Sequence, residues 1–223
     1  MRRAAVLAEI ADRITAMRLT HPTRVAVDGV DAAGKTLMAG ELADILRSKG
    51  RPVIRASIDG FHYPAAHRLA KGENSPEGYY LDSFNYPAII GTFLEPLGPD
   101  GSGLYQEAVY DYRSDRPIDG PVLKADPTAV VLVDGVFLLR PELRSYWDFS
   151  VFVHVDFEVA LRRAERRDLK YFDSVYALRR KYRSRYFPGQ EIYFSAATPT
   201  KWASTVVDNN DLAGPFIVGS RQA

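Results

Sequence analysis

Short apolar runs alternate with longer amphipathic stretches along this chain. Five runs have the length of buried strands and almost no polar interruption, at residues 24–28, 53–58, 129–133, 150–155 and 205–207. Strands that are apolar throughout are typical of a parallel sheet with helices on both faces. The pattern therefore predicts an α/β fold of three layers with a mostly parallel sheet.

Two stretches have the spacing of helices. In residues 35–49 leucine, isoleucine and methionine recur at helical intervals, and Gly50 follows where a helix C-terminal glycine is expected. Residues 1–19 begin with two arginines, as a twin-arginine signal does, but Glu9 and Asp12 interrupt the part that would have to be apolar. We expect an amphipathic first helix instead.

Composition narrows the class of protein. A chain of 223 residues with 46% apolar residues is long and apolar enough for one globular domain, which we expect to span residues 1–223. A net charge of +1 gives no reason to expect nucleic acid as a partner. There is no cysteine, so disulfides and cysteine-based metal sites are excluded. No apolar run has the roughly 18 residues of a membrane span. We expect a cytoplasmic protein with a small-molecule substrate, and the sequence leaves homo-oligomerisation open.

Residues 29–36 read Gly-Val-Asp-Ala-Ala-Gly-Lys-Thr and form the strongest motif of the chain. The two glycines allow a tight loop whose N–H groups turn toward phosphates, Lys35 adds a positive charge, and the Thr36 hydroxyl suits Mg²⁺. A buried strand precedes the motif and a helix follows it, as a P-loop requires. We therefore predict ATP and Mg²⁺ as cofactors, with Asp31 as a hydrogen-bonding residue of the loop. The residues expected to contact the nucleotide are Gly29, Val30, Asp31, Ala32, Ala33, Gly34, Lys35, Thr36 and Leu37.

Acidic residues end or follow three of the predicted strands: Asp28, Asp59 and Asp134. The carboxyl ends of parallel strands meet at one edge of a sheet, where ligands bind, so the three acids suggest a shared site. Asp59 could accept the proton of a substrate hydroxyl, and Asp134 could hold Mg²⁺ together with Thr36. The competing interpretations are a turn-capping role for Asp59 and a turn-forming role for Asp134.

A P-loop alone does not separate kinases from GTPase switches and ATPase motors. The guanine-reading Asn-Lys-x-Asp pattern of GTPases is absent, and Asp-Asn-Asn-Asp at 208–211 does not match it. Motors are usually larger or built from repeats. The acid at position 59 favours a kinase.

Four segments resemble the uridine kinase and phosphoribulokinase family of P-loop kinases. They are the P-loop at 29–36, Asp-Gly-Phe-His-Tyr at 59–63, Val-Asp-Gly-Val at 133–136 and the run from 140 to 168. The second is similar to the family's Asp-x-Phe-Tyr, and the third to its Glu-Gly-Ile. The resemblance extends from about residue 24 to 211 and implies the three-layer P-loop fold with a helical lid, with Asp59 as catalytic base.

The segments that would read a nucleoside depart from the family pattern. Ser-Phe-Asn-Tyr-Pro at 83–87 stands where uridine kinases have Asn-Phe-Asp-His-Pro, so Asn85 replaces the ribose-binding acid. The family's pyrimidine-reading histidine would fall near Asp115, and its second Arg-Gly-Arg-Asp is Leu-Lys-Tyr-Phe at 169–172. The resemblance therefore implies a uridine kinase-like phosphotransferase, with pantothenate, ribulose phosphate, nicotinamide riboside or a sugar as alternative acceptors. A nucleotide-binding regulatory protein without an acceptor is the alternative from another class.

Between Arg162 and Arg185 the chain carries ten lysines and arginines. One interpretation is a solvated helix face. The other is a lid, at about 162–186, that closes over ATP and places Arg163, Arg166 and Arg167 against the transferred phosphoryl group. We prefer the lid for this first cluster, and expect the second cluster, at 179–185, to be surface or an anion site for a charged substrate.

Residues 60–128 are irregular and rich in proline, glycine and tyrosine. Aromatic side chains near Asp59 can stack on a base or sugar, although any one of them can equally belong to the core. As a group they predict an acceptor pocket. The residues expected to contact the acceptor are Asp59, Phe61, His62, Tyr63, Asn85, Tyr110, Tyr112 and Asp115.

Overall fold

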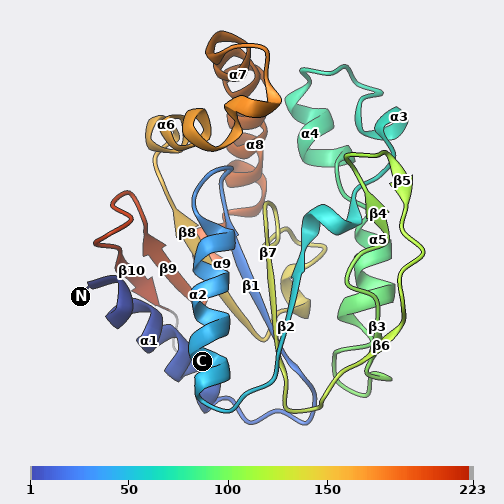
Figure 1. Ribbon diagram of the computed structural model, residues 1–223, viewed down its shortest axis with the longest axis vertical. Coiled ribbons are helices and arrows are strands. Elements are labelled where there is room, and N and C mark those ends of the chain that lie inside the picture. The colour runs from blue at the N-terminus through green and yellow to red at the C-terminus, as the bar shows by residue number, and fades with distance from the viewer. Residues whose placement is uncertain (1, 221–223) are drawn as a thin grey trace.

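The computed structural model describes residues 2–220, and a six-stranded sheet forms their centre in the order β10-β9-β8-β1-β7-β2 (Figure 1). The strands are β1 (Thr23–Gly29), β2 (Val53–Ser57), β7 (Val130–Gly135), β8 (Phe149–His154), β9 (Thr205–Asp208) and β10 (Phe216–Ser220). The first five pair in parallel, and each corresponds to one of the predicted apolar runs. The predicted α/β fold with a mostly parallel sheet is confirmed.

The edge strand β10 pairs antiparallel with β9 and was not predicted. Its side chains are mostly exposed, including Phe216 and Val218. An edge strand without a buried face leaves no apolar run in the sequence, so the hydrophobic pattern carries no signal for it.

Helices cover both faces of the sheet, and the two faces have separate cores. On one face lie α1 (Arg2–Ala16) and α2 (Lys35–Ser48), which pack on each other and on Val25 and Val27 of β1. Both helices were predicted, and Gly50 ends the second with a positive φ of 79°. The other face is covered by short helices and by α8 (Phe187–Ala197), which lies behind the sheet in Figure 1.

The second core is aromatic. It is supplied mainly by α4 (Pro76–Asp82), α5 (Tyr86–Ile89), the π-helical turn Ile90–Leu94 and α8. Phe137 is fully buried at its centre and contacts the rings of Tyr79, Tyr80, Phe84 and Tyr193. Much of the aromatic group that the sequence assigned to an acceptor pocket is therefore core.

The rest of residues 60–128 forms a flank beside β2 (Figure 1). It contains the 3₁₀ turn Ile58–Phe61, α3 (Ala65–Arg68) and two small antiparallel ribbons. The ribbons are β3 (Leu104–Tyr105) with β6 (Leu123–Lys124), and β4 (Tyr110–Asp111) with β5 (Arg116–Pro117). The Val109 N–H donates to the Gly60 carbonyl at 2.8 Å, which fixes the β4–β5 ribbon against the turn that carries Asp59.

The predicted lid lies above the carboxyl ends of the strands, at the top of Figure 1. It comprises most of α6 (Phe157–Asp168), a 3₁₀ turn (Leu169–Tyr171), α7 (Val175–Lys181) and a π-helical turn (Tyr182–Tyr186). The π-helical turn leads into α8, and α9 (Pro199–Trp202) follows outside the lid. The short 3₁₀ turn Arg144–Tyr146 precedes β8. Within residues 2–220 no helix has the length and hydropathy of a membrane span.

Candidate active site

The P-loop connects β1 to α2, and its glycines are required by the geometry. Gly29 has φ of 152°, and a Cβ on it would lie 2.4 Å from the Val153 carbonyl oxygen of β8. Gly34 has φ of 93° and directly precedes α2, whose first turn receives no side-chain cap. The N–H groups at the start of this 14-residue helix are therefore left for an anion, as a nucleotide site needs.

Lys35 lies at the start of α2 and folds back onto the loop, where its Nζ donates to the Val30 carbonyl at 2.7 Å. Burial lowers the pKa of Lys35, while the negative charges of Asp31, Asp28 and Asp134 oppose that shift. An ammonium surrounded by three acids is placed to exchange its loop carbonyl for the oxygens of a phosphate.

Asp31 accepts hydrogen bonds from the Tyr79 hydroxyl at 2.8 Å and from Gln190 Nε2 at 3.2 Å. These donors come from α4 and α8, so the P-loop is fastened to two distant elements. Burial, and then the charge of Asp31, raise the pKa of Tyr79 well above its usual value, so the phenol stays a donor. These hydrogen bonds agree with the expectation that Asp31 is a hydrogen-bonding residue of the loop. Its two partners, Tyr79 and Gln190, could not be predicted from the P-loop motif.

Asp28 does not join the other two acids, contrary to the sequence-based expectation of one shared site. It is fully buried beneath the loop, where Gly29 N–H at 2.7 Å, Leu139 N–H at 3.2 Å and the Tyr193 hydroxyl donate to it. Burial raises the pKa of Asp28 to about 6, although these donors and Lys35 pull it down. Asp28 therefore supports the loop from the side of α8.

A cavity of about 420 Å³ opens beside the P-loop at the carboxyl ends of β2 and β7. It brings Asp59, Asp134 and Thr36 together, as the strand order predicts. Its full lining consists of Thr36, Arg55, Ala56, Ser57, Asp59, Tyr112, Arg113 and Asp134.

Oxygen donors suited to Mg²⁺ meet at one wall of this cavity. Thr36 Oγ1 donates to Asp134 Oδ2 at 2.6 Å, and Arg55 Nη2 lies 2.7 Å from Asp134 Oδ1. No group of three or more acidic, histidine or cysteine side chains in residues 2–220 could form a metal centre of its own. One hydroxyl and one carboxylate fit an ion that takes its remaining ligands from phosphates and water. Arg55 was not predicted as a site residue, although a charged residue inside an otherwise apolar strand can indicate one.

Asp59 also lines the cavity, from the 3₁₀ turn after β2, and 56% of its side chain is exposed. His62 Nε2 lies 3.6 Å from Asp59 Oδ1, and His62 Nδ1 is 2.9 Å from the Ser83 carbonyl, to which it can only donate. Burial raises the pKa of Asp59, but the hydrogen bond and charge of His62, followed by Lys35 and Arg113, outweigh it and lower the pKa. Asp59 is therefore an ionised carboxylate at neutral pH.

Besides Asp59, two of the residues predicted to contact the acceptor lie at or next to the cavity. Tyr112 lines it, and the His62 ring stacks on Phe84 at 4.4 Å and meets Tyr112 at 4.8 Å. Phe61 is a correction to the sequence-based assignment, because it is fully buried in the aromatic core and offers no surface to a ligand. Tyr63 contacts the His67 ring in a tilted arrangement with the ring centres 4.2 Å apart, and it does not line the cavity.

The other three predicted acceptor contacts hold the flank together. Asp115 Oδ1 accepts from Ala65 N–H at 2.8 Å and from the Tyr110 hydroxyl at 3.1 Å. Asn85 Oδ1 accepts from Ala88 N–H at 3.0 Å and so caps α5. Asn85, Tyr110 and Asp115 do not line the cavity, and their side-chain oxygens are used in local structure.

The three lid arginines occupy different positions. Arg163 donates to the carbonyls of Ala33, Asn209 and Asn210 at 2.6–3.3 Å, which makes it a positioning residue between α6, the P-loop and the end of β9. This corrects the expectation that Arg163 faces the phosphoryl group. Arg167 pairs with Asp168 at 2.7 Å, and its positive charge contributes to lowering the pKa of Lys35. Arg166 is exposed.

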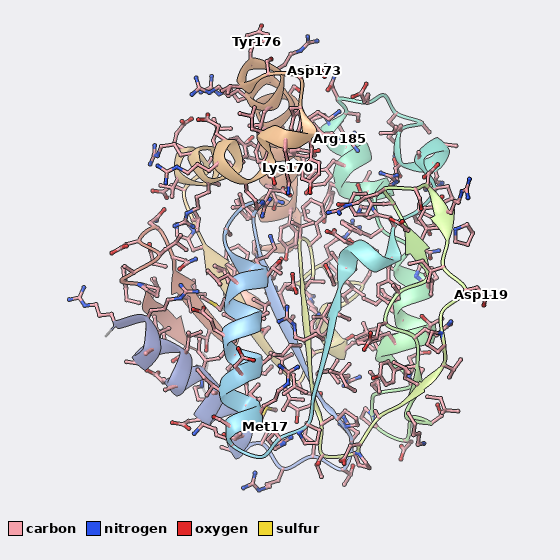
Figure 2. All side chains as sticks on the ribbon, viewed as in Figure 1. Met17, Asp119, Lys170, Asp173, Tyr176 and Arg185 are labelled. Atoms are coloured by element: carbon pink, nitrogen blue, oxygen red, sulfur yellow. The ribbon has the colours of Figure 1, made fainter. Side chains whose placement is uncertain are left out.

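The second basic cluster is largely paired. Arg179 contacts Glu165 at 2.6 Å and Lys181 contacts Glu73 at 2.9 Å. Arg185, labelled in Figure 2, is buried and donates to the carbonyls of Gly72, Glu73 and Ser75. The predicted lid is thereby tied to the segment before α4.

Comparison with known proteins points to one group of enzymes. No family model matches the chain. It is 27% identical over 202 residues to a pantothenate kinase of Bradyrhizobium diazoefficiens, covering 84% of this chain and 62% of that protein. It is 28% identical over 162 residues to a uridine kinase of Geobacillus kaustophilus, covering 69% of this chain and 72% of that protein. The chain thus spans less than two thirds of the pantothenate kinases it matches.

Solved structures agree. A structure described as a possible uridine kinase from Bacillus stearothermophilus superposes with a TM-score of 0.73 at 20% identity, over 92% of this chain and 99% of that one. A proposed fructose transport system kinase from Silicibacter sp. TM1040 gives 0.72 at 21% identity, over 88% and 96%. The chain is thus similar in sequence to uridine and pantothenate kinases, and it has the fold of the uridine kinase-like P-loop kinases. These relatives are named for different acceptors, so their names do not identify one acceptor for this chain.

Proposed function

We propose that the chain is an ATP-dependent kinase that transfers the γ-phosphate to a hydroxyl of a nucleoside or similar small metabolite. The observation that carries the proposal is the cavity in which Asp59 faces Thr36 and Asp134 beside the P-loop. A base, a metal-binding pair and a phosphate-binding loop are the parts that phosphoryl transfer needs. We further propose that residues 1–223 act as one kinase domain in the cytoplasm, with 162–186 as its lid.

In this proposal the loop N–H groups and Lys35 hold the phosphates of ATP, and Thr36 and Asp134 hold Mg²⁺. When bound, Mg²⁺ neutralises charge on the transferred phosphate. Arg55 stands 2.7 Å from Asp134 and keeps that carboxylate turned toward Thr36. Arg167, which contributes to the field at Lys35, is the lid residue best placed to reach the phosphates.

Asp59 accepts the proton of the attacking hydroxyl, and the hydroxyl oxygen then bonds to the γ-phosphorus as ADP leaves. Because the Nδ1–H of His62 is bound to the Ser83 carbonyl, its Nε2 is the atom turned toward Asp59. When Nε2 also carries a proton, the positive charge of His62 faces Asp59 and favours the ionised form that the reaction consumes.

The family resemblance favours a nucleoside, and pantothenate, ribulose phosphate, nicotinamide riboside and sugars are the alternatives. The three residues that replace or neighbour the nucleoside-reading positions, Asn85, Tyr110 and Asp115, are engaged in local structure. The alternative from another class is a nucleotide-binding regulatory protein that has no acceptor.

The test is ATP consumption across a panel of these hydroxyl compounds, with Asp59→Asn and the matched control Asp119→Asn. Asp119 is exposed on the flank, away from the cavity (Figure 2). We expect Asp59→Asn to lower acceptor-dependent turnover by about 10²- to 10⁴-fold and Asp119→Asn to leave it unchanged. Tight ATP binding without stimulation by any hydroxyl compound would favour the regulatory alternative.

A further inference from the structure

Arg113 is a charged residue of the cavity to which the proposed chemistry gives no task. It lines the cavity together with Asp59 and Tyr112 and comes from the turn between β4 and β5. Its Nε donates to the Tyr112 hydroxyl at 3.3 Å. Its guanidinium carbon lies 5.6 Å from the Tyr112 ring centre and 5.7 Å from that of Tyr171 in the predicted lid.

The positive charge of Arg113 is not balanced by an ion pair. Within residues 2–220 no carboxylate lies within 4.0 Å of its guanidinium nitrogens, whereas the other arginine of the cavity, Arg55, pairs with Asp134 at 2.7 Å. Arg113 contributes, after His62 and Lys35, to lowering the pKa of Asp59. The acceptor side of the cavity therefore keeps one uncompensated guanidinium.

The backbone that carries Arg113 is fixed. Asp111 Oδ1 accepts from the Arg113 N–H at 3.0 Å, and Asp111 Oδ2 accepts from the Ser114 hydroxyl at 2.6 Å, which closes the turn. The ribbon is joined to the Asp59 turn through Val109 and Gly60. The position of Arg113 relative to Asp59 is thus set by hydrogen bonds on the chain, and tyrosine rings flank the side chain on two sides.

Arg113 belongs to the acceptor side and not to the nucleotide side. Lys35 and the loop glycines do not line this cavity, whereas Arg113 lines it together with Tyr112 and Asp59. A guanidinium offers a planar fork of N–H donors that matches carboxylates and phosphates, and stacking on an aromatic face is a common way to hold it for that purpose.

We propose that the acceptor of this kinase carries an anionic group, a carboxylate or a phosphate, which Arg113 binds while a hydroxyl of the same molecule faces Asp59. The inference rests on the proposed function and narrows its substrate class to hydroxy acids and sugar phosphates. The cavity of about 420 Å³ sets the scale of such a molecule as that of a small metabolite.

The experiment compares matched acceptors that differ in charge. Pantothenate is paired with its neutral alcohol panthenol, and ribulose 5-phosphate with ribulose; uridine is included as a neutral nucleoside. Each is assayed with the wild type, Arg113→Gln, Arg113→Lys and the control Arg116→Gln. Arg116 is an exposed arginine of the same ribbon that does not line the cavity. The two pairs separate a carboxylate from a phosphate as the recognised group.

We expect the wild type to prefer the anionic member of at least one pair. Arg113→Gln should raise the KM of that acceptor by about 10- to 100-fold, the value of a charge-assisted hydrogen bond. The KM of ATP should stay unchanged, Arg113→Lys should restore part of the affinity, and Arg116→Gln should behave as the wild type.

Two results overturn the inference alone: a neutral member phosphorylated as efficiently as its anionic partner, or an Arg113→Gln variant that loses kcat equally for charged and neutral acceptors. The second would place Arg113 on the transferred phosphoryl group. If no hydroxyl compound of either charge is phosphorylated, the proposed function itself fails and the inference falls with it.

Discussion

Replacing Asp28 by asparagine tests the electrostatics beneath the P-loop. The carboxyl of Asp28 has a pKa of about 6 in the folded protein against 3.8 in the unfolded chain, chiefly because it is buried. The folded state therefore binds this proton more tightly than the unfolded state. The stability that the protonated acid provides is fully present below about pH 4 and is lost as the pH rises to about 6 and above.

The two pKa values differ by about two units, which corresponds to about 3 kcal/mol in the free energy of unfolding. Asp28→Asn cannot titrate. Its single amide oxygen can take the place of Oδ1, which accepts from Gly29 N–H, or of Oδ2, which accepts from Leu139 N–H, and the loss of the other acceptor is a cost that does not depend on pH. The unfolded carboxyl is already partly ionised at pH 4, so the free energy of unfolding of the variant minus that of the wild type should rise by about 2–3 kcal/mol between pH 4 and pH 7.

The assay is urea unfolding followed by circular dichroism at half-unit pH steps, on the wild type, Asp28→Asn and Asp119→Asn. The subtraction removes every titration that the two proteins share, so the other buried groups do not enter the difference. A difference that stays constant within about 1 kcal/mol across this range would refute the assignment of Asp28 as a buried, weakly acidic carboxyl.

Two further substitutions probe the loop and the base. Gly29→Ala places a Cβ against a β8 carbonyl at a φ of 152°, so we expect about 1–3 kcal/mol of strain. ATP binding, measured by fluorescence titration, should weaken. The control Gly91→Ala has open space around its new Cβ and should keep both the stability and the ATP affinity of the wild type. His62→Asn removes a group that lowers the pKa of Asp59, so the acid limb of the kcat/KM profile should move to higher pH; an unmoved limb would separate His62 from the base.

The sequence predicted those parts of the fold in which apolar side chains recur at the spacing of a strand or a helix. The five parallel strands and α2 had such patterns, whereas β10 is exposed and α8 follows directly from a basic π-helical turn. The P-loop was predictable because its chemistry lies in eight consecutive residues. Asp59 and Asp134 could be placed in one site because parallel strands end at the same edge.

The remaining parts of the site depend on contacts between distant segments. Asp28 follows Ala26 by two positions and shares its face of β1, and only the structure shows that α8 covers this face with Tyr193. Arg113 reaches the cavity through a turn of the irregular flank. Asn85 and Asp115 were named by alignment to a family motif, but their oxygens cap a helix and join two segments of the flank.

The central claim is transfer of the terminal phosphate of ATP to an acceptor hydroxyl with Asp59 as base. It is tested most directly with ATP labelled in the γ-phosphate, by mass spectrometry of the acceptor after incubation with the wild type and with Asp59→Asn. The account predicts one labelled phosphate on the acceptor for each ADP formed, with formation slowed by about 10²-fold or more in the variant. Label found only in inorganic phosphate, or an equally active Asp59→Asn variant, would contradict it.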